Sequence, residues 1–487
     1  MFWQILGGIL LAFLLLTAIR AAFFRPKKKR FPACAPENVD AARAVRHLSE
    51  AIQIPTISYP DETQMDWEKF REFHAFLAKA YPLIHQHTTR EDVSGASLIF
   101  HWKGKNSALD PIALLSHQDV VPVTAGTEDD WTHPAFSGHV DEEFIWGRGA
   151  IDMKNHLICT MEAVETLLEE GYEPQRDVYI CFGHDEEVVG SEVSGAKDIV
   201  KTLQSRGVHL DSVLDEGGPF LPLKVKGLID KYLIAVGTSE KGYADFEISI
   251  AAKGGHSSAP PNHSALGELA VAIQELEENQ FKSKFLPYLP KLLKNIGRNM
   301  SYAGRFVLCN FWLLRPLLKL VLKKIPQAAS LIRTTTAVTM AEGSPACNVL
   351  PQKATAVVNF RMMPGTTRAD VEKHIRKTVS NKKLEIRYLK GKEASPFSPT
   401  DSRAYLKIEE LCFGQEPNSV MAPFLVMGGT DACFYEPICE NIYRFSPFRI
   451  TPNLLTAAHA TDERLPVAAV GDAVAFFKRY VRGLTES

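Results

Sequence analysis

The sequence predicts an α/β protein built from two compact units, with one apolar helix at its N-terminus. Its length of 487 residues exceeds that of one ordinary domain and suffices for substantial hydrophobic cores. From Ala41 onward helical periodicity alternates with short apolar runs, whereas after Gly237 several segments alternate between apolar and polar residues. Apolar residues at 45% and charged residues at 23% lie near globular averages, so the chain is expected to fold.

The N-terminal segment is strongly apolar. Residues 1–19 carry no charged side chain, and Arg20 and a basic run within residues 25–30 follow them. Such a stretch can span a bilayer, which needs roughly 17–25 apolar residues. Because a cleaved signal peptide carries its basic residues before the apolar core, we predict a transmembrane anchor over residues 1–24 and a basic linker over residues 25–40. A cleaved signal peptide is the alternative.

The basic flank also predicts the side of the membrane on which the body lies. Positively charged flanks usually stay in the cytoplasm, so we predict a single-pass membrane protein with a cytoplasmic body. Large domains can cross a membrane regardless of flanking charge. A secreted or extracytoplasmic body is therefore the alternative.

The first compact unit is predicted to contain a mostly parallel, mixed sheet. The helical stretch AARAVRHLSEAIQI precedes the apolar run IALLSH, the helix NHLICTMEAVETLLEEG, and the runs VYICFGH and SVLDEGG. Strands that alternate with helices favour parallel pairing, with helices on both faces and ligands beyond the carboxyl ends of the strands. We therefore predict a catalytic domain in two parts, residues 41–237 and residues 396–487, the second containing AYLKIEELCF and FLVMGG.

A second unit is predicted to interrupt the first over residues 238–395. The segments ADFEISIAAKGG, ATAVVNFRMM and KLEIRYLKG alternate as half-buried antiparallel strands do, and GELAVAIQELEEN and ADVEKHIRKTVSN have helical periodicity. This order of elements suits a small ferredoxin-like α+β insertion. We expect it to act as a lid or dimerisation domain.

Part of this insertion is unusual in charge. Residues 281–340 contain no Asp or Glu but many Lys and Arg among apolar residues, as in NFWLLRPLLKLVLKK. Arg315, Pro316 and Lys319 argue against a second membrane span. We predict an amphipathic helical elaboration packed on the lid. The alternative is a surface that attracts anionic or fatty substrates or lies on anionic lipid.

Net charge and cysteine spacing limit the classes of function. A formal charge of −2 gives no general field for nucleic acid, and the usual nucleic-acid motifs are absent from the sequence. Small-molecule or peptide substrates are therefore predicted. The eight cysteines are scattered without CxxC spacing, which favours buried reduced thiols, although their even number leaves disulfides open.

Two short motifs carry the first candidate site residues. His117 and Asp119 follow the run IALLS one residue apart, so both side chains point the same way on extended backbone. Asp119 could therefore orient a metal-binding imidazole, although an isolated HxD is usually a structural pair. Asp152 follows a Gly-Arg-Gly turn at the head of an apolar helix. It is either a helix N-cap or a carboxylate that bridges two cations.

Further carboxylates follow two other apolar runs. Asp185, Glu186 and Glu187 come directly after VYICF, where buried charge is costly without cations or partners. Asp215 ends the run SVLD, and His459 lies in the motif HATDER of the C-terminal part. Two histidines and three carboxylates at strand or loop ends form a mixed nitrogen and oxygen set that suits zinc.

The order of these motifs resembles a known family. HxD, WGRGxxDMK, DEE, LDEGG, GGHSS, NVLP, FRxxP, GGTD and a late histidine are typical of the di-zinc metallopeptidases that include carboxypeptidases, aminoacylases, acetylornithine deacetylase and succinyl-diaminopimelate desuccinylase. The chain is most similar to the subgroup of carboxypeptidase S and N-fatty-acyl-amino-acid hydrolase/synthase. The resemblance extends from Pro36 to the C-terminus and implies a zinc-peptidase-like catalytic domain with an inserted lid.

The resemblance also implies roles for individual residues. Two zinc ions per subunit would be held by His117 and Asp215 for one ion and by Glu187 and His459 for the other, with Asp152 bridging both. The catalytic group would comprise Glu186 as general base, Asp119 behind His117, and His256 as oxyanion donor, often across a homodimer formed through the lid. Substrate would be bound by Asn348, Arg361, Gly429, Thr430 and Asp431, with Arg361 as the carboxylate clamp.

The sequence departs from the family pattern at two places. The late motif commonly reads HGxNE but is HATDE here, and Ala432 and Cys433 follow GGTD where many relatives have Ser-Arg or Ala-Arg. The second difference concerns substrate preference more than catalysis. We predict zinc-dependent hydrolysis of an amide bond next to a free-carboxylate amino acid, in a short peptide or an N-acyl amino acid. The alternative is a catalytically inactive binding or scaffold protein on the same fold.

Overall fold

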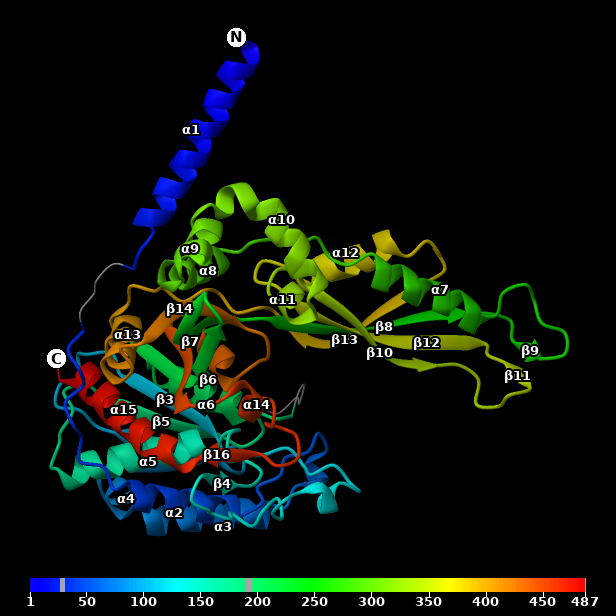
Figure 1. The fold of residues 1–487 in the computed structure, drawn as a ribbon. Helices are drawn as coiled ribbons and strands as arrows, with labels where there is room; N and C mark the ends of the chain where they lie inside the picture. The colour runs from blue at the N-terminus through cyan, green and yellow to red at the C-terminus, as the bar shows by residue number, and fades with distance from the viewer. Residues whose placement is uncertain (27–30, 189–194, 487) are drawn as a thin grey trace.

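The structure is a computed structural model that describes residues 1–26, 31–188 and 195–486. Residues 27–30, which form most of the predicted basic run, lie outside the described residues. The chain forms one large α/β unit with an eight-stranded mixed sheet, from which a smaller unit with a four-stranded sheet projects (Figure 1). The apolar N-terminal helix extends away from both.

The larger sheet is parallel at its centre and antiparallel at one edge. Its strands, in spatial order, are β1 (Thr89–Val93), β2 (Ser97–Trp102), β5 (Val178–Gly183), β3 (Ile112–His117), β6 (Ser212–Val225), β15 (Ile442–Arg449), β7 (Ile229–Glu240) and β14 (Ser419–Val426). Parallel pairs join β5 to β3, β3 to β6, β6 to β15 and β7 to β14. The apolar runs IALLSH, VYICFGH, SVLDEGG and FLVMGG therefore all lie in this sheet.

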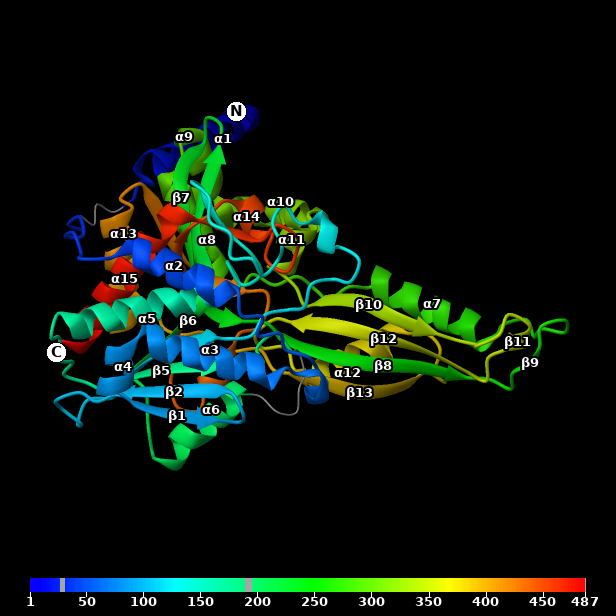
Figure 2. The same cartoon turned by 90° about the horizontal axis from the view of Figure 1, so that it is seen from below.

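Helices cover both faces of the larger sheet (Figure 2). One face packs against α2 (Ala41–Ile52), α3 (Trp67–Ala80), α4 (Pro82–His87), α5 (Lys154–Glu169), α13 (Arg403–Gln415) and α15 (Val467–Thr485). The other face packs against α6 (Gly195–Ser205) and the short helix η3 (Asp431–Tyr435). Two separate apolar cores result, one around Phe182 and Phe445 and the other around Ile199 and Tyr435.

Strand β6 continues beyond the predicted run. It pairs in parallel with β15 from Val213 to Phe220, with a register shift after Asp215, and from Phe220 to Val225 it pairs antiparallel with β7. Within this shift Gly217 has no room for a Cβ atom, which would lie 2.3 Å from the backbone of Arg444. The irregularity of the β6–β15 pairing thus falls directly after Asp215 of LDEGG.

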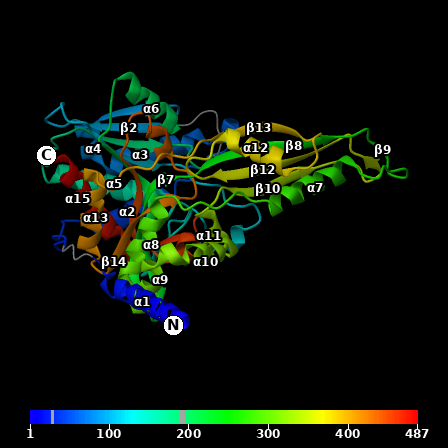
Figure 3. The same ribbon diagram turned by 90° about the horizontal axis from the view of Figure 1, so that it is seen from above.

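The smaller sheet has four antiparallel strands in the spatial order β10-β12-β8-β13. Along the chain β8 (Gly242–Ala251), α7 (Ala265–Glu278), β10 (Thr335–Glu342), β12 (Lys353–Met362), α12 (Arg368–Thr378) and β13 (Glu385–Lys392) follow the predicted order of strands and helices. Phe246, Leu269 and Phe360 belong to a core of its own. A two-residue pair, β9 (Gly255–His256) with β11 (Val349–Leu350), lies at its far end (Figure 3).

The basic segment forms the helices α8 (Tyr288–Asn299), α9 (Tyr302–Cys309), α10 (Phe311–Lys324) and α11 (Pro326–Ser330). The expectation that it packs on the lid is wrong for α8, because Tyr288, Leu289 and Leu292 cluster with Ala422 and Leu425 of β14. The physical reason is that β14 is an edge strand of the larger sheet whose apolar side chains need cover.

The N-terminal helix α1 (Phe2–Phe23) is the one described helix that is long and apolar enough to cross a membrane. Only 11% of its most apolar window is buried inside the structure. Thr17 and Ala21 are the exceptions, since both are almost completely buried near the C-terminal end of the helix.

Two short strands, β4 (Phe144–Trp146) and β16 (Arg464–Pro466), join loops that are distant in sequence. Their antiparallel pairing brings the WGRG turn beside the HATDER motif. The short helices η1 (Glu62–Gln64), η2 (Glu128–Asp130) and α14 (Pro452–Leu455) complete the described elements. All eight cysteines are free thiols, but only Cys159, Cys181, Cys412 and Cys439 are buried, so the prediction of buried reduced thiols holds for half of them.

A buried ion pair between β15 and the end of β7 provides a test of the fold. Arg444 Nη2 donates to Glu240 Oε1 over 2.8 Å, and both side chains are about 1% exposed. Arg444→Met removes the nearest cation from the buried Glu240 carboxylate and leaves only the more distant Lys392 at 3.7 Å, so the free energy of unfolding measured with urea should fall by about 3–5 kcal/mol.

Arg376→Gln is the matched control, because Arg376 pairs with Glu372 on the exposed surface of α12. It should change the free energy of unfolding by less than about 0.5 kcal/mol. Equal losses in the two variants would contradict the assigned role of the buried pair.

Candidate metal centre

His117 and Asp119 form a buried pair at the carboxyl end of β3. His117 Nδ1 lies 3.0 Å from the Asp119 carbonyl oxygen and 3.3 Å from its Oδ1. The Asp119 carboxylate also accepts hydrogen bonds from the Ser58 hydroxyl (2.6 Å) and from the backbone N–H of Glu187 (3.1 Å). Asp119 thus holds one nitrogen of His117 and leaves Nε2 available to face the site.

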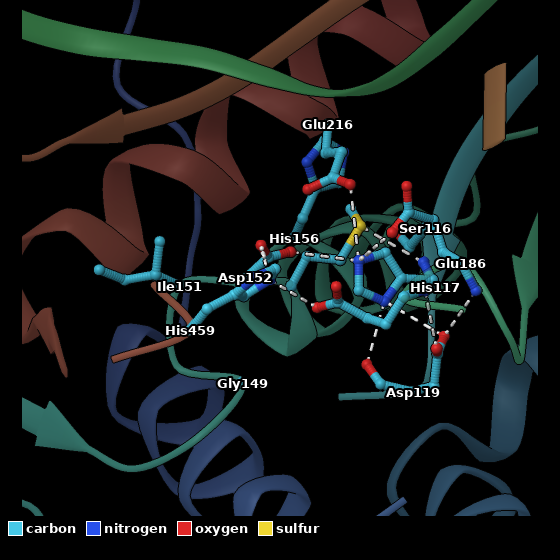
Figure 4. Close-up of polar contacts among 12 residues, drawn as sticks. Ser116, His117, Asp119, Gly149, Ile151, Asp152, His156, Glu186, Glu216 and His459 are labelled. Atoms are coloured by element: carbon cyan, nitrogen blue, oxygen red, sulfur yellow. Dashed lines mark hydrogen bonds and ion pairs between the residues drawn. The ribbon is translucent and has the colours of Figure 1, made fainter. Parts of the chain in front are cut away.

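The Asp152 carboxylate lies between two histidines (Figure 4). His117 Nε2 is 3.2 Å from Asp152 Oδ1 and 3.5 Å from Glu216 Oε1. On the other side, His459 Nε2 is 3.1 Å from Asp152 Oδ2 and 2.9 Å from Glu187 Oε1. Two three-residue groups therefore share Asp152, and in each group the candidate ligand atoms lie within 4.8 Å of one another.

A second carboxylate holds the backbone of the Asp152 loop. Glu463 Oε1 accepts hydrogen bonds from the N–H groups of Gly149 (3.0 Å), Ile151 (2.8 Å) and Asp152 (3.1 Å). Its other oxygen pairs with Arg148 at 2.6 Å, and both side chains are buried. Glu463 was not among the predicted residues. The opposite charges of Arg148 in WGRG and Glu463 in HATDER were a signal that these two motifs meet.

His459 has a backbone φ of +64°, in the left-handed region that non-glycine residues rarely adopt. Such a conformation costs of order 1–3 kcal/mol and persists only where the surroundings enforce it. Here it turns the imidazole toward Asp152 and Glu187.

The structure places Glu216, and not the predicted Asp215, beside His117. The Asp215 carboxylate accepts hydrogen bonds from the N–H groups of Glu216 (2.8 Å) and Ala432 (2.9 Å), and it belongs to neither three-residue group. Neighbouring residues on a strand point to opposite faces, so only one of the two carboxylates can face His117.

Glu186 lies beside the two groups without belonging to either. Its Oε2 is 4.0 Å from His117 Nε2, and its side chain is only 15% exposed. Burial raises the pKa of Glu186 well above its usual value, and the Glu216 and Glu187 carboxylates raise it further, although His117 opposes them. A carboxyl group whose pKa is raised in this way is suited to accept and release a proton during a reaction.

The charge balance of the cluster fits bound cations. Burial and repulsion from Asp152 raise the pKa of Glu216 to about 8, and burial also raises the pKa of Glu187. A divalent ion would offset this buried negative charge, and imidazole with carboxylate oxygen is a donor set that zinc accepts. The carboxylates that interact with His117 are Asp119, Asp152, Glu186, Glu187, Asp215, Glu216 and Asp431.

A cavity of about 600 Å³ opens onto the cluster, a size that suits a small ligand. Three of the predicted substrate residues, Gly429, Thr430 and Asp431, line it together with Asp152, Glu186 and His459. Arg361 also lines it, and its guanidinium carbon lies 5.7 Å from the centre of the Tyr243 ring. Lys392, a cavity residue that the sequence did not indicate, is 2.8 Å from the Cys433 sulfur.

Two predicted residues lie far from this cavity. His256 is in β9 at the far end of the smaller sheet (Figure 1), where its Nδ1 is 2.8 Å from the Ser258 hydroxyl and its ring is exposed. The Asn348 carbonyl accepts a hydrogen bond from Ser257 N–H over 3.0 Å, which places Asn348 at the same end. Within one chain these two residues lie together but away from the metal cluster.

The fold and the clustered donors define a metal-dependent hydrolase with its site at the carboxyl ends of parallel strands. The chain belongs to peptidase family M20/M25/M40, whose family model matches residues 113–483.

Curated relatives are similar in sequence to this chain over most of their own length. The probable carboxypeptidase S-like 2 of Dictyostelium discoideum is 33% identical, with 98% of this chain and 93% of the relative covered. The N-fatty-acyl-amino acid synthase/hydrolase PM20D1 of Mus musculus is 33% identical (89% and 86% covered), and carboxypeptidase S of Saccharomyces cerevisiae is 31% identical (91% and 84%). The protein is therefore a metallopeptidase or amidohydrolase.

Solved structures share the fold. An M20 family metallo-carboxypeptidase from Sulfolobus solfataricus has a TM-score of 0.65 at 19% identity, with 91% of this chain and 99% of that chain covered. Human carnosine dipeptidase 1 has a TM-score of 0.62 at 14% identity, with 92% and 97% covered. At these identities the likeness concerns the fold alone.

Proposed function

We propose that the protein hydrolyses an amide bond whose amine side is an amino acid with a free α-carboxylate. The observation that supports this proposal is the composition of one cavity, which holds both the metal-binding cluster and the cations Arg361 and Lys392. A substrate that places its amide at the cluster can reach these cations with its carboxylate. The named relatives are enzymes, which gives no support to an inactive scaffold.

Two zinc ions per subunit are the proposed cofactors. His117, Asp152 and Glu216 would hold one, and Asp152, Glu187 and His459 the other. Glu216 thus takes the role that the sequence assigned to Asp215. When bound, such a pair lowers the pKa of a shared water and polarises the scissile carbonyl.

Glu186 is the proposed general base. It lies beside the ligands but outside both groups, so its carboxylate is free to take a proton from the attacking water and deliver it to the leaving amine. Asp119 is a positioning residue, because it holds His117 Nδ1 and the backbone of the Glu186–Glu187 turn.

Arg361 is the proposed carboxylate clamp, since a planar guanidinium can donate two parallel hydrogen bonds to one carboxylate. Lys392 would add a second positive charge beside Cys433, at the position where many relatives carry arginine. Gly429, Thr430 and Asp431 would complete the substrate loop, which Glu240 holds by accepting a hydrogen bond from Thr430 N–H.

The acid component of the substrate is either a peptide residue or a fatty acyl group. Carboxypeptidase S is a relative named for action on peptides, and N-fatty-acyl-amino acid synthase/hydrolase is a relative named for action on fatty acyl groups. The word synthase in the second name also covers condensation, the reverse reaction. Relative kcat/KM on N-acyl amino acids and on dipeptides with the same C-terminal residue decides between them. Loss of all turnover after chelation, with recovery on adding zinc, is the expected metal dependence.

His256 and Asn348 are proposed to act in the site of a partner subunit. They lie together at the far end of the smaller unit, so one chain alone does not bring them to its own cavity. A homodimer formed through a lid over residues 238–395 would supply them. The catalytic domain would then comprise residues 41–237 and 396–487.

We further propose that α1 is a membrane anchor spanning residues 1–24, followed by a linker over residues 25–40, with the body on the cytoplasmic side. Its length and apolarity support this role. The buried positions of Thr17 and Ala21 support retention of the helix, because a segment that is removed needs no packing partner.

Measuring bound zinc distinguishes between Asp215 and Glu216 as the metal ligand in LDEGG. Glu216→Gln removes a carboxylate that faces His117 and should lower bound zinc from two toward one per subunit, measured by atomic absorption after dialysis. Asp215→Asn is the matched control and should retain two. Loss of zinc only in the Asp215 variant would restore the original assignment.

Mixed subunits test both the base and the action of His256. Glu186→Gln and His256→Ala should each lower kcat by about 10²–10⁴-fold when alone. If His256 acts on the partner's site, a dimer of one Glu186→Gln subunit and one His256→Ala subunit has one site in which both Glu186 and His256 are intact. Random mixing after denaturation and refolding should then restore about one quarter of wild-type activity.

No recovery in the mixture, with hybrid dimers shown by mass spectrometry, would contradict action across the dimer. Zinc content should stay at the wild-type value in the Glu186→Gln protein. This separates loss of the base from loss of metal.

Arg361 is tested with a pair of substrates that differ at one group. Arg361→Gln should raise KM by about 10–100-fold for a substrate with a free α-carboxylate, because a charge-assisted pair is lost, and should change it little for the corresponding primary amide. Arg387→Gln, on the exposed edge of the same sheet, is the control. An equal effect on both substrates would refute the clamp.

A further inference from the structure

We propose that α10 and the end of α9 lie within the membrane leaflet beside α1 and rest on anionic lipid. This inference rests on the proposed anchor role of α1. It adds a second, non-spanning contact between the body and the bilayer.

Helix α10 is apolar on both sides. Its inner side packs onto the body, where Phe311 contacts Phe285 with ring centres 5.4 Å apart and Leu322 joins the cluster around α8. Its outer side carries large apolar residues at helical spacing, each 45–59% exposed: Leu313, Leu317, Leu320 and Val321. A contiguous stripe of exposed large apolar side chains marks a surface that meets a partner or a membrane, so the outer side of α10 requires a cover.

Contacts with α1 identify that cover as lipid. Trp312, the second residue of α10, lies 6.3 Å from the Phe13 ring and 5.7 Å from the Arg20 guanidinium, measured to the ring centres. Arg20 and Phe13 are separated by about 10 Å along the helix axis. If α1 spans the bilayer with Arg20 at its interface, Trp312 lies below that interface, among the acyl chains.

Polar contacts fix the same arrangement. The Tyr302 hydroxyl donates to the Ala18 carbonyl over 3.0 Å, and Asn310 Nδ2 donates to the Thr17 carbonyl over 3.3 Å. Both acceptors belong to the last two turns of α1. Helix α9 is therefore attached to the part of α1 that would enter the membrane, both at its first residue, Tyr302, and at its junction with α10, Asn310.

The charge of the segment specifies the lipid. Residues 281–340 contain no acidic side chain, and α10 itself carries four cations, Arg315, Lys319, Lys323 and Lys324. Such cations beside an apolar face are typical of helices that lie at an anionic membrane surface. A protein partner would have to present carboxylates and also fit between α10 and the bilayer that α1 enters.

The consequence concerns the orientation of the body. One spanning helix behind a linker would allow the catalytic unit to rotate freely above the membrane. A second contact at α10 would fix which face of the body meets the bilayer, with α1 and α10 both projecting from the same side of the molecule (Figure 1).

Tryptophan quenching by brominated phospholipid tests this inference on the full chain in vesicles of phosphatidylcholine with phosphatidylserine. Trp3 reports on α1 and Trp312 on the start of α10, and the chain has four other tryptophans. The background protein carries Trp3→Phe and Trp312→Phe. Leu320→Trp in this background reports on the outer side of α10, and Val140→Trp, an exposed site on the large unit, is the matched control.

We expect the Leu320→Trp protein to lose at least twice as much fluorescence as the background protein, and the Val140→Trp protein to match the background. Quenching should decrease when Lys319, Lys323 and Lys324 are all changed to Gln. Hydrolysis in detergent should be unchanged in every variant, which verifies the fold.

Leu320→Trp without added quenching would overturn the proposal. The anchor is assessed separately, by a protein that carries Trp312→Phe alone and keeps Trp3. If Trp3 is quenched while Leu320→Trp is not, α1 spans the membrane and α10 does not enter it. If neither is quenched, the anchor itself is refuted.

Discussion

The Asp152 carboxylate is the contact on which the rest of the site depends. Its two oxygens face His117 on one side and His459 on the other, so two donor groups from distant parts of the chain meet at one residue. Negative charge at this depth is costly without compensation. Among the described residues only the two histidines face the Asp152 carboxylate, since the three N–H groups of the loop and Arg148 interact with the Glu463 carboxylate behind it. Bound cations would offset the charge of Asp152.

This constraint explains several local features that would otherwise be unfavourable. His459 adopts a left-handed backbone conformation, and the pKa of Glu216 is raised to about 8 mainly by burial. Neither feature would persist in a weakly packed loop. Both lie at the carboxyl edge of a sheet whose two faces are covered by separate apolar cores, and the stability of those cores sustains the strained, charged site.

The functional arrangement also separates two tasks in space. The larger unit holds the candidate metal ligands and the proposed general base, whereas the smaller unit contributes Arg361 to the same cavity and carries His256 at its far end. The helices α8 to α11 belong to neither task. Helix α8 covers the edge strand β14, and α9 and α10 contact α1.

The sequence by itself determined the types of element and the chemical groups available. Apolar runs predicted the strands β3, β5, β6 and β14 of the larger sheet, and period-two alternation predicted β8, β12 and β13 of the smaller one. Polar residues after IALLS made His117 and Asp119 candidate site residues, and the Gly-Arg-Gly turn did the same for Asp152. The tertiary structure decided which neighbouring carboxylate enters the site. Asp215 and Glu216 are chemically similar and adjacent, and which of them faces His117 depends on the register shift of β6 against β15 and on the contact of Asp215 with Ala432, both made more than 200 residues apart. The tertiary structure also decided that α8 packs on β14 and that His256 lies away from the cavity of its own chain. Both placements depend on how the two units are arranged in space, and no local sequence pattern encodes this arrangement.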